Sequence, residues 1–247
     1  MKILVINPNT SELMRQQIDE GAKMYAGPGT EIVTICAASG PRSIEGEYDV
    51  ALAAVGTLQT LIAHEKEYDG FVVGCGQDPG LYACREVTSK PVIGIGEGSM
   101  YMACFLGHKF TSMTALWRMV PLMETIVRKY GLWDRCASVR AAGARVSDIA
   151  NDRDKLREAF IKEAKIAIEQ DGADVICLSG AAMVGMDKKM EQVLGVPVTD
   201  GVVSAVKLVE AQVGYKLKTS KKNTFASPEK KEAINIDEVL QSIYRRS

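Results

Sequence analysis

The sequence has 247 residues, and its 30 basic and 31 acidic side chains nearly cancel to a formal net charge of −1. This balance provides no general attraction for nucleic acid or for an anionic membrane. The chain begins directly with a strand pattern, and no apolar run approaches the roughly 20 residues of a membrane span. We therefore expect a cytoplasmic protein that acts on a small molecule and has neither a nucleic-acid nor a membrane partner.

Short apolar runs rich in β-branched residues alternate with longer helical patterns along the whole chain. The first four runs occupy residues 3–7, 31–35, 70–74 and 91–95, and the next four occupy residues 109–115, 137–143, 174–180 and 197–201. Such alternation is typical of β-α-β units that build a mainly parallel sheet. The sequence therefore predicts an α/β fold.

The two sets of runs are spaced alike, which indicates a duplication. Ile3 precedes Ile32 by 29 residues, and Phe110 precedes Val139 by the same number. A period of about 105 residues is too long for a solenoid and suggests two related half-domains with a ligand site between them. We expect two pseudosymmetric lobes, each a mainly parallel four-stranded sheet flanked by helices, with an active-site cleft between the lobes.

The predicted lobes have approximate limits. The N-terminal lobe covers residues 1–98 and is completed by a helix over about 202–214, and the C-terminal lobe covers residues 99–201. A short buried helix over about 97–107 links them. Residues 215–247 form a basic C-terminal extension, for which we expect a solvated segment or a subunit contact.

The cysteines and glycines give no sign of a bound metal or nucleotide. The six cysteines are scattered without a C-x-x-C pair, and only His64 and His108 are available to join them, which argues against structural zinc or a disulfide framework. The glycines of PVIGIGEGSM lack the spacing of a dinucleotide fingerprint, and no P-loop lysine occurs. We expect no metal and no cofactor.

Cys75 directly follows the run at 70–74, at the carboxyl end of a predicted parallel strand. We expect Asp78 to cap the next helix, with Pro79 in its first turn. The positive end of that helix dipole favours a thiolate. The N–H groups of Gly76 and Gln77 can hold a carboxylate or a developing enolate oxygen. Cys75 is therefore the candidate catalytic residue.

The duplication tests this candidate through the second half. Cys75 follows Asp69 by six residues, and the residue six after Asp174 is Gly180. The loop SGAAM around Gly180 keeps the small, amide-rich character of the first loop, so Gly180 and Ala181 are candidate substrate contacts, but it contains no thiol. Removing a proton from one face of a carbon and returning it to the other needs two acid/base groups, and the sequence provides one.

Three other loops contribute candidate substrate contacts. Asn9 lies in INPNTS after the first strand, where the neighbouring hydroxyls suit a helix cap at least as well as a ligand contact. Thr114 ends the fifth strand, KFTSMTA. The glycine-punctuated loop SGPRSIEGEYD suits a pocket wall, with Ile44 as its apolar member and Arg42 placed either to read an anion or to lie on the surface.

Nine segments in order along the chain resemble the hydantoin racemase family: INPNTS, SGPRSIEG, CGQDPGLYACRE, PVIGIGE, LGHKF, CASVRA, DGADVICL, GVPVTD and the tail LKTSKK. That family belongs to the aspartate/glutamate racemase superfamily, which also contains allantoin racemases, arylmalonate decarboxylases and maleate isomerases. The resemblance implies two α/β lobes, no cofactor, a homo-oligomer and a cleft at the lobe junction.

The resemblance also implies a mechanism. In racemases of this family one cysteine from each lobe flanks the substrate carbon, and Cys75 matches the first. The second belongs to a motif like L-G-C-A-G-M, where this sequence reads LSGAAM with Gly180 at the cysteine position. We therefore predict a cofactor-independent racemase or epimerase in which Cys75 removes the C5 proton of a 5-substituted hydantoin or related ureide.

Gly180 leaves several alternatives open. The second acid can be water or an unrecognised group, or the cysteine was changed by engineering. A one-cysteine decarboxylase or a cis-trans isomerase of the same superfamily fits a single thiol. The last alternative is an impaired variant that binds the substrate without racemising it.

Overall fold

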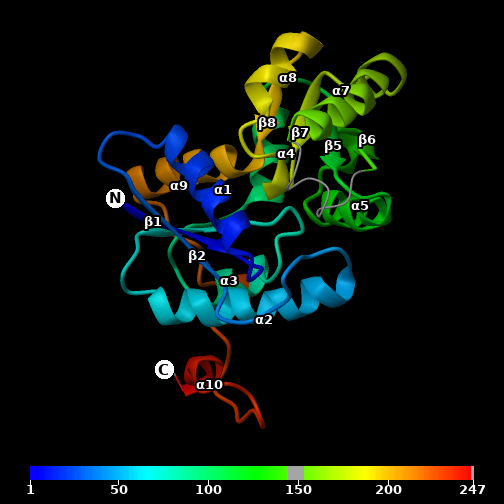
Figure 1. Cartoon of the computed structure of the whole chain (residues 1–247). Helices are drawn as coiled ribbons and strands as arrows, with labels where there is room; N and C mark the ends of the chain where they lie inside the picture. Colours follow the sequence, from blue (N-terminus) through cyan, green and yellow to red (C-terminus); the bar gives the residue numbers. More distant parts are fainter. Residues whose placement is uncertain (144–152, 246–247) are drawn as a thin grey trace.

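Each half of the chain forms a four-stranded parallel sheet, as the alternation of strand and helix patterns predicts (Figure 1). The computed structural model describes residues 1–143 and 153–245. The strands are β1 (Lys2–Asn7), β2 (Glu31–Cys36), β3 (Gly70–Val73), β4 (Val92–Gly94), β5 (Phe110–Thr114), β6 (Cys136–Ala141), β7 (Val175–Leu178) and β8 (Val198–Asp200). Their orders, β2-β1-β3-β4 and β6-β5-β7-β8, are the same topology twice, so the predicted duplication is confirmed.

Helices alternate with the strands, as expected for β-α-β units. The α-helices are α1 (Glu12–Met24), α2 (Glu47–His64), α3 (Leu81–Val87), α4 (Ile95–Cys104), α5 (Val120–Lys129), α7 (Arg153–Gln170), α8 (Asp187–Leu194), α9 (Gly201–Gly214) and α10 (Glu238–Arg245). Short 3-10 helices are η1 (Trp117–Met119), η2 (Trp133–Arg135), η3 (Ala181–Met183) and η4 (Asn223–Phe225). Within the described residues, no helix has the length and apolar character needed to cross a bilayer.

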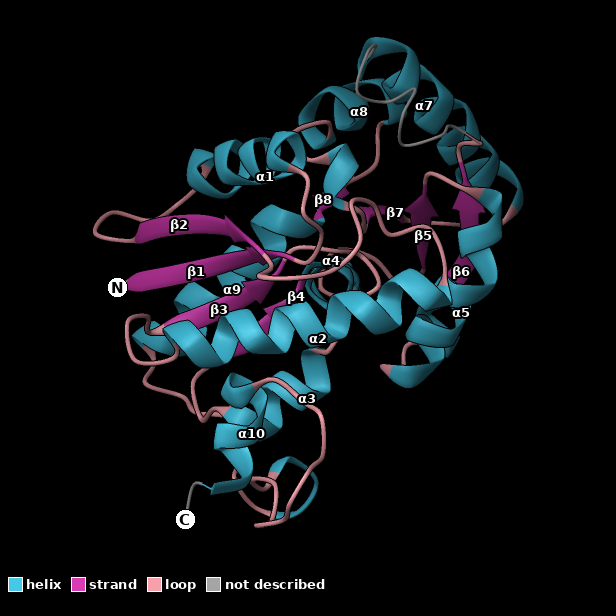
Figure 2. Cartoon of the chain, turned by 60° about the horizontal axis from the view of Figure 1, so that its bottom comes forward, coloured by secondary structure: helices cyan, strands magenta, loops and turns pink. Residues whose placement is uncertain are grey.

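Helices cover both faces of each sheet (Figure 2). On the first sheet, α1 and α9 lie on one face and α2 and α3 on the other; on the second sheet, α7 and α8 lie opposite α4 and α5. One apolar core runs continuously from the first half, through Phe71 and Leu81, to the second half, through Phe110 and Val127. The two sheets are therefore joined by shared burial of apolar surface.

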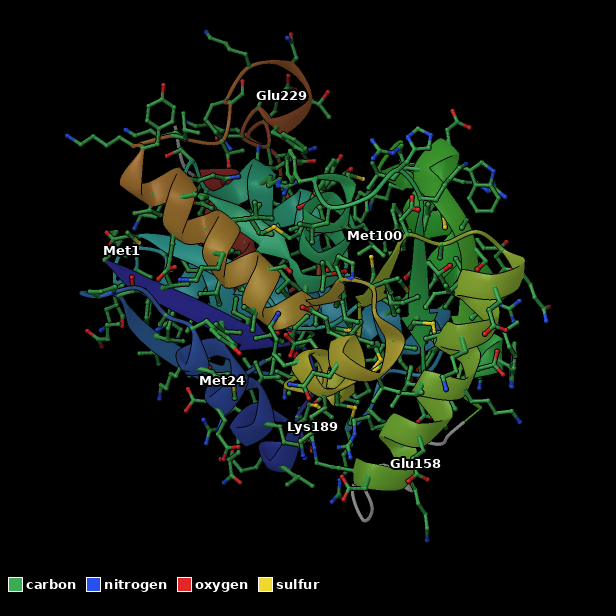
Figure 3. All side chains as sticks on the ribbon, turned by 90° about the horizontal axis from the view of Figure 1, so that it is seen from above. Met1, Met24, Met100, Glu158, Lys189 and Glu229 are labelled. Carbon is green, nitrogen blue, oxygen red and sulfur yellow. The ribbon has the colours of Figure 1, made fainter. Side chains whose placement is uncertain are left out.

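The last helix of each half packs against the sheet of the other half. Helix α4 follows β4 but contacts β5, β7 and β8, whereas α9 follows β8 and contacts β3 and β4. The two helices also pack against each other, and Met100 of α4 is fully buried between the halves (Figure 3). The lobe boundaries inferred from the sequence remain a prediction. They depend on whether α4 and α9 are counted with the half that precedes them or with the half whose sheet they contact.

Two details differ from the sequence-based expectations. Residues 29 apart are paired in the first sheet, where Ile3 faces Ile32. They are not paired in the second, because the register shifts between Phe110 and Thr111 and Val139 pairs with Ser112. The linking helix α4 begins at Ile95, directly after β4, and ends at Cys104, so it lies two to three residues before the helix that we expected over about 97–107.

The described part of the C-terminal extension is attached to its own chain. Thr219 N–H donates to the Ser89 carbonyl at 2.8 Å, and the Phe225 ring lies 5.5 Å from the Tyr82 ring. Helix α10 then packs against α2, while the loop around Glu229 projects from the body (Figure 3). The extension therefore covers α3, the helix that follows the Cys75 loop; residues 246 and 247 of the predicted extension lie outside the described part.

Candidate active site

A cavity of about 140 Å³ lies at the carboxyl ends of strands from both sheets. An engineered cavity of about 150 Å³ holds one benzene molecule, so this volume suits a small ring. Its walls come from the ends of β1, β3, β5 and β7, from the loop after β2 and from η1 and α5. Ligands of open α/β sheets usually bind at these strand ends.

All eight site residues predicted from the sequence line this one cavity. They are Asn9, Ile44, Cys75, Gly76, Gln77, Thr114, Gly180 and Ala181. Arg42 also reaches the lining, and its side chain is exposed with no ion pair among the described residues. The structure thus brings the predicted residues together, while their chemical roles belong to the proposal below.

Burial dominates the electrostatics of Cys75. Protein atoms surround the thiol, although it keeps some accessible surface in the cavity, and burial raises the pKa of Cys75 to about 12. The Gln77 N–H donates to the sulfur and opposes this shift, whereas the charge of Asp78 adds to it. The predicted lowering by a helix dipole is wrong, because α3 begins only at Leu81 and a dipole acts over about the first turn.

The sequence suggested that Asp78 caps α3. Its carboxylate instead binds the first turn of α4 and the residue that ends α5. Its carboxylate accepts the N–H groups of Gly96 at 3.0 Å and Glu97 at 2.7 Å and the Tyr130 hydroxyl at 2.6 Å. The backbone at Asp78 is left-handed, with φ 46°, which turns the carboxylate away from α3. Gly80 takes the cap position of α3, and burial raises the pKa of Asp78 to about 7.

The loops after β3 and β7 touch each other. A Cβ added at Gly76 would lie 2.5 Å from the Ser179 carbonyl oxygen and 3.4 Å from the Gly180 Cα. Only glycine permits this approach, because both neighbours are backbone. The Cys75 loop and the Gly180 loop therefore form adjacent walls of the cavity.

Asn9 presents a fixed side-chain amide at the cavity. Its Oδ1 accepts Asn7 Nδ2 at 2.8 Å and Ser11 N–H at 2.9 Å, so its Nδ2 is the group left to donate. The sequence analysis missed Asn7, which is fully buried and determines this orientation. The available signal was an asparagine at the end of a continuously apolar strand, because a buried asparagine needs a specific partner.

Methionines form much of the apolar wall, and sequence reasoning missed them. The lining includes Met14 of α1, Met113 of β5, Met119 and Met123 of the adjoining η1 and α5, and Met183 of η3. Gln77 Nε2 lies 2.7 Å from the Met123 sulfur, which is a weak acceptor. No sequence pattern unites these residues, because only the folded chain brings them together.

The remaining titratable candidates lie elsewhere. His64 is half-buried and its Nδ1 lies 3.1 Å from Glu67 Oε1, and His108 is exposed before β5; neither lines the cavity. In residues 1–143 and 153–245, no group of three histidine, cysteine or carboxylate side chains is placed to hold a metal ion. The chemistry available at the cavity is therefore that of a thiol, a guanidinium, amides and hydroxyls.

Comparison with known proteins gives this arrangement a family. The sequence model of the Asp/Glu/Hydantoin racemase family matches residues 3–209. The chain belongs to the Asp/Glu/Hydantoin racemase family. The match covers both sheets and every predicted site residue, from Asn9 to Ala181.

Several relatives resemble the chain over nearly its full length. A hydantoin racemase from Pseudomonas sp. (strain NS671) is 42% identical over 235 residues, which are 95% of this chain and 94% of the relative. The structure of the allantoin racemase from Klebsiella pneumoniae has a TM-score of 0.92 at 38% identity and covers 98% of both chains. That of the allantoin racemase from Pseudomonas fluorescens has a TM-score of 0.92 at 39% identity and covers 95% of this chain and all of the other. Racemases are isomerases, and this member of their family is an enzyme of that class.

Proposed function

We propose that the protein is a cofactor-independent racemase or epimerase of the hydantoin racemase type, in which Cys75 removes the C5 proton of a 5-substituted hydantoin or related ureide. The observation that carries this proposal is the composition of the cavity wall. Among the described residues, Cys75 is the one thiol in this wall, and the other polar side chains there are a guanidinium, amides and hydroxyls.

The substrate itself makes this chemistry possible without a metal or pyridoxal. The carbonyl next to C5 acidifies the C5 proton, and its removal by the Cys75 thiolate forms the S–H bond and leaves the electron pair in an enolate. The N–H groups of Gly76, Gly180 and Ala181 have no protein acceptor in the described part of the chain, and they border the cavity. These amides stabilise the developing oxyanion.

The Gln77 N–H has a different role from the one expected from the sequence. It donates to the Cys75 sulfur, so it favours the thiolate over the thiol. Burial acts in the opposite direction and keeps the thiolate a minor species at neutral pH. The thiolate that does form is a strong base, because it is poorly solvated.

The side chains around the thiol bind the hydantoin or ureide ring. Asn9 Nδ2, whose orientation Asn7 determines, donates to a carbonyl oxygen of the ureide. Thr114 supplies a hydroxyl from the second sheet, and Ile44 contacts the substituent at C5. The methionine wall fits flexible apolar substituents, because methionine adapts its shape.

A one-cysteine decarboxylase of the same superfamily is the second candidate. The single thiol in the wall favours it, because a decarboxylase needs one proton donor for the enediolate that remains after loss of carbon dioxide. A cis-trans isomerase would use the same sulfur as a nucleophile. These reactions differ in their products, so they are separated by direct assay.

The test is incubation of the unaltered protein with a 5-substituted hydantoin in heavy water, with C5 deuterium followed by NMR against a buffer blank. Deuterium gained well above the blank supports proton removal at C5. Carbon dioxide released from a substituted malonate, with no deuterium gained by the hydantoin, would instead support the decarboxylase. A protein that binds the hydantoin and changes neither compound would contradict both.

A further inference from the structure

Cys75 and Gly180 occupy equivalent places in the two halves. Asp69 Oδ2 accepts Lys2 N–H at 2.7 Å while Asp69 N–H donates to the Lys2 carbonyl at 2.7 Å. Asp174 makes the same pair of bonds with Lys109, both at 2.8 Å. Cys75 and Gly180 each follow their aspartate by six residues. The equivalence found in the sequence therefore holds in the hydrogen bonding of the two sheets.

The turns that end the two loops also match. Gly80, five residues after Cys75, has φ 76°, and Gly185, five residues after Gly180, has φ 75°. Both are left-handed conformations that favour glycine. The two loops thus turn at equivalent positions, and positions 75 and 180 lie on the adjacent walls that these loops give the cavity.

Among the described residues, the wall around Gly180 offers no thiol, carboxyl or imidazole as a proton donor. This wall consists of Ser179, Gly180, Ala181, Ala182 and Met183. The Ser179 hydroxyl is buried and already shares hydrogen bonds with Ser99 at 3.1 Å and Ser112 at 3.0 Å. A neutral hydroxyl in such a network is a much weaker acid than a thiol.

We propose that this protein exchanges the C5 proton on the Cys75 face alone, so that it returns the proton with retention of configuration faster than it inverts the carbon. The thiolate takes the proton, the resulting S–H exchanges with solvent, and the thiol returns a solvent proton to the same face of the enolate. No other reactant is consumed. This inference rests on the proposed function and adds its stereochemical course.

The inference also makes the two enantiomers unequal. A ring held by the same amides directs the C5 proton of one enantiomer toward Cys75 and that of its mirror image toward Gly180. Only the first has a base within reach. One enantiomer therefore exchanges, and the other stays largely unlabelled.

Position 180 has room for a second thiol, which provides the decisive variant. Gly180 has φ −103° and ψ 143°, an extended conformation open to any residue. An added Cβ would meet only the Met183 Cε at 2.9 Å, the end of a flexible side chain. Gly180→Cys adds an acid/base group on the second face, and Gly180→Ala adds the same Cβ without the thiol.

The experiment incubates each pure enantiomer of a 5-substituted hydantoin in heavy water, under reducing conditions, with the unaltered protein, Gly180→Cys or Gly180→Ala. C5 deuterium is read by NMR, and configuration is read by chiral chromatography. We expect the unaltered protein to label one enantiomer with retention, and Gly180→Ala measures what the added Cβ alone does to labelling and inversion. We expect Gly180→Cys to raise inversion on the order of 100-fold, the usual contribution of a positioned acid or base, and to label both enantiomers.

The outcomes separate this inference from the proposed function. Inversion by the unaltered protein at the rate of deuterium uptake, from either enantiomer, would overturn one-face exchange and leave Cys75 as a base. A folded Gly180→Cys protein, shown by an unchanged thermal unfolding temperature, with no gain in inversion would also overturn it. No deuterium in either enantiomer with any of the three proteins would contradict the proposed function itself.

Discussion

The loop after β3 and the loop after β7 turn at equivalent positions but differ in their chemistry. Both follow a buried parallel strand, both turn through a left-handed glycine, Gly80 or Gly185, and both line one cavity. The first loop carries Cys75, whereas the second has Gly180 at the equivalent position. The two halves therefore keep the strand ends and the glycine turns, and they differ in the side chain placed at positions 75 and 180.

A second difference concerns how each loop is tied to the helix after the next strand. In the first half, Asp78 on the loop reaches the amides of Gly96 and Glu97 in α4. In the second half, the carboxylate belongs to the strand end: Asp200 caps α9 and accepts the loop's Gly185 N–H at 2.7 Å. In the first half the carboxylate lies on the loop, and in the second half it lies at the strand end before the helix. The two halves should therefore lose different amounts of stability when the carboxylate is removed.

The largest expected effect comes from Asp78→Ala. It leaves the Tyr130 hydroxyl and two amides without their buried acceptor, and we expect a loss of about 4 kcal/mol in the free energy of unfolding. Asp200→Ala is the matched variant and should cost less, because its partners are all amides near a helix start. Urea unfolding of both variants measures the difference; a greater loss for Asp200→Ala would contradict this ranking.

Gly76 and Gly180 give the next contrast. An alanine at position 76 drives its Cβ against the Ser179 carbonyl, and we expect a loss of about 3 kcal/mol. Gly180→Ala displaces only the end of Met183 and should cost less than about 1 kcal/mol. Equal unfolding temperatures for the two variants would show that the loops are not in the contact described.

The pH dependence of exchange distinguishes burial from the helix dipole at Cys75. The raised pKa means that the thiolate fraction grows with pH throughout the range below about 12. Catalysed deuterium uptake, after subtraction of the buffer blank, should therefore rise about tenfold per pH unit from pH 7 to 9. A plateau below pH 8 would indicate a thiol with a lowered pKa.

The smallest expected effect concerns the ends of the helices that follow the two loops. Lys221 in the extension donates to the Arg85 carbonyl at 2.9 Å and the Glu86 carbonyl at 2.6 Å near the end of α3, whereas α8 ends at the left-handed Gly195. Lys221→Met should cost about 1 kcal/mol in unfolding free energy. Lys222 is the exposed neighbour and supplies the control. An equal loss of unfolding free energy for Lys222→Met would show that the Lys221 hydrogen bonds do not stabilise the end of α3.

The architecture and the cavity wall could be predicted because they depend on local patterns and on duplication. Strand positions followed from β-branched runs, and the places of Cys75 and Gly180 followed from their equivalent positions at the carboxyl end of one strand in each half. Asn9, Ile44 and Thr114 were found in the same way, as loop residues at those ends.

The contacts that tune the site could not be predicted, because they join residues far apart in the sequence. Asp78 was assigned to the nearest helix, but a positive φ turned it toward Tyr130. The pKa of Cys75 was predicted in the wrong direction because desolvation depends on how much protein surrounds the sulfur, which a linear pattern does not reveal. The sequence also gave no warning of the register shift at Phe110.

The most direct test of Cys75 as the base compares two cysteine variants in the C5 deuterium assay. Cys104 lies outside the cavity lining and is half-buried, so Cys104→Ser controls for the loss of a thiol elsewhere. We predict that Cys75→Ser lowers deuterium uptake at least about 100-fold while Cys104→Ser keeps the rate of the unaltered protein. Full uptake by Cys75→Ser would contradict the account, because another group would then remove the proton.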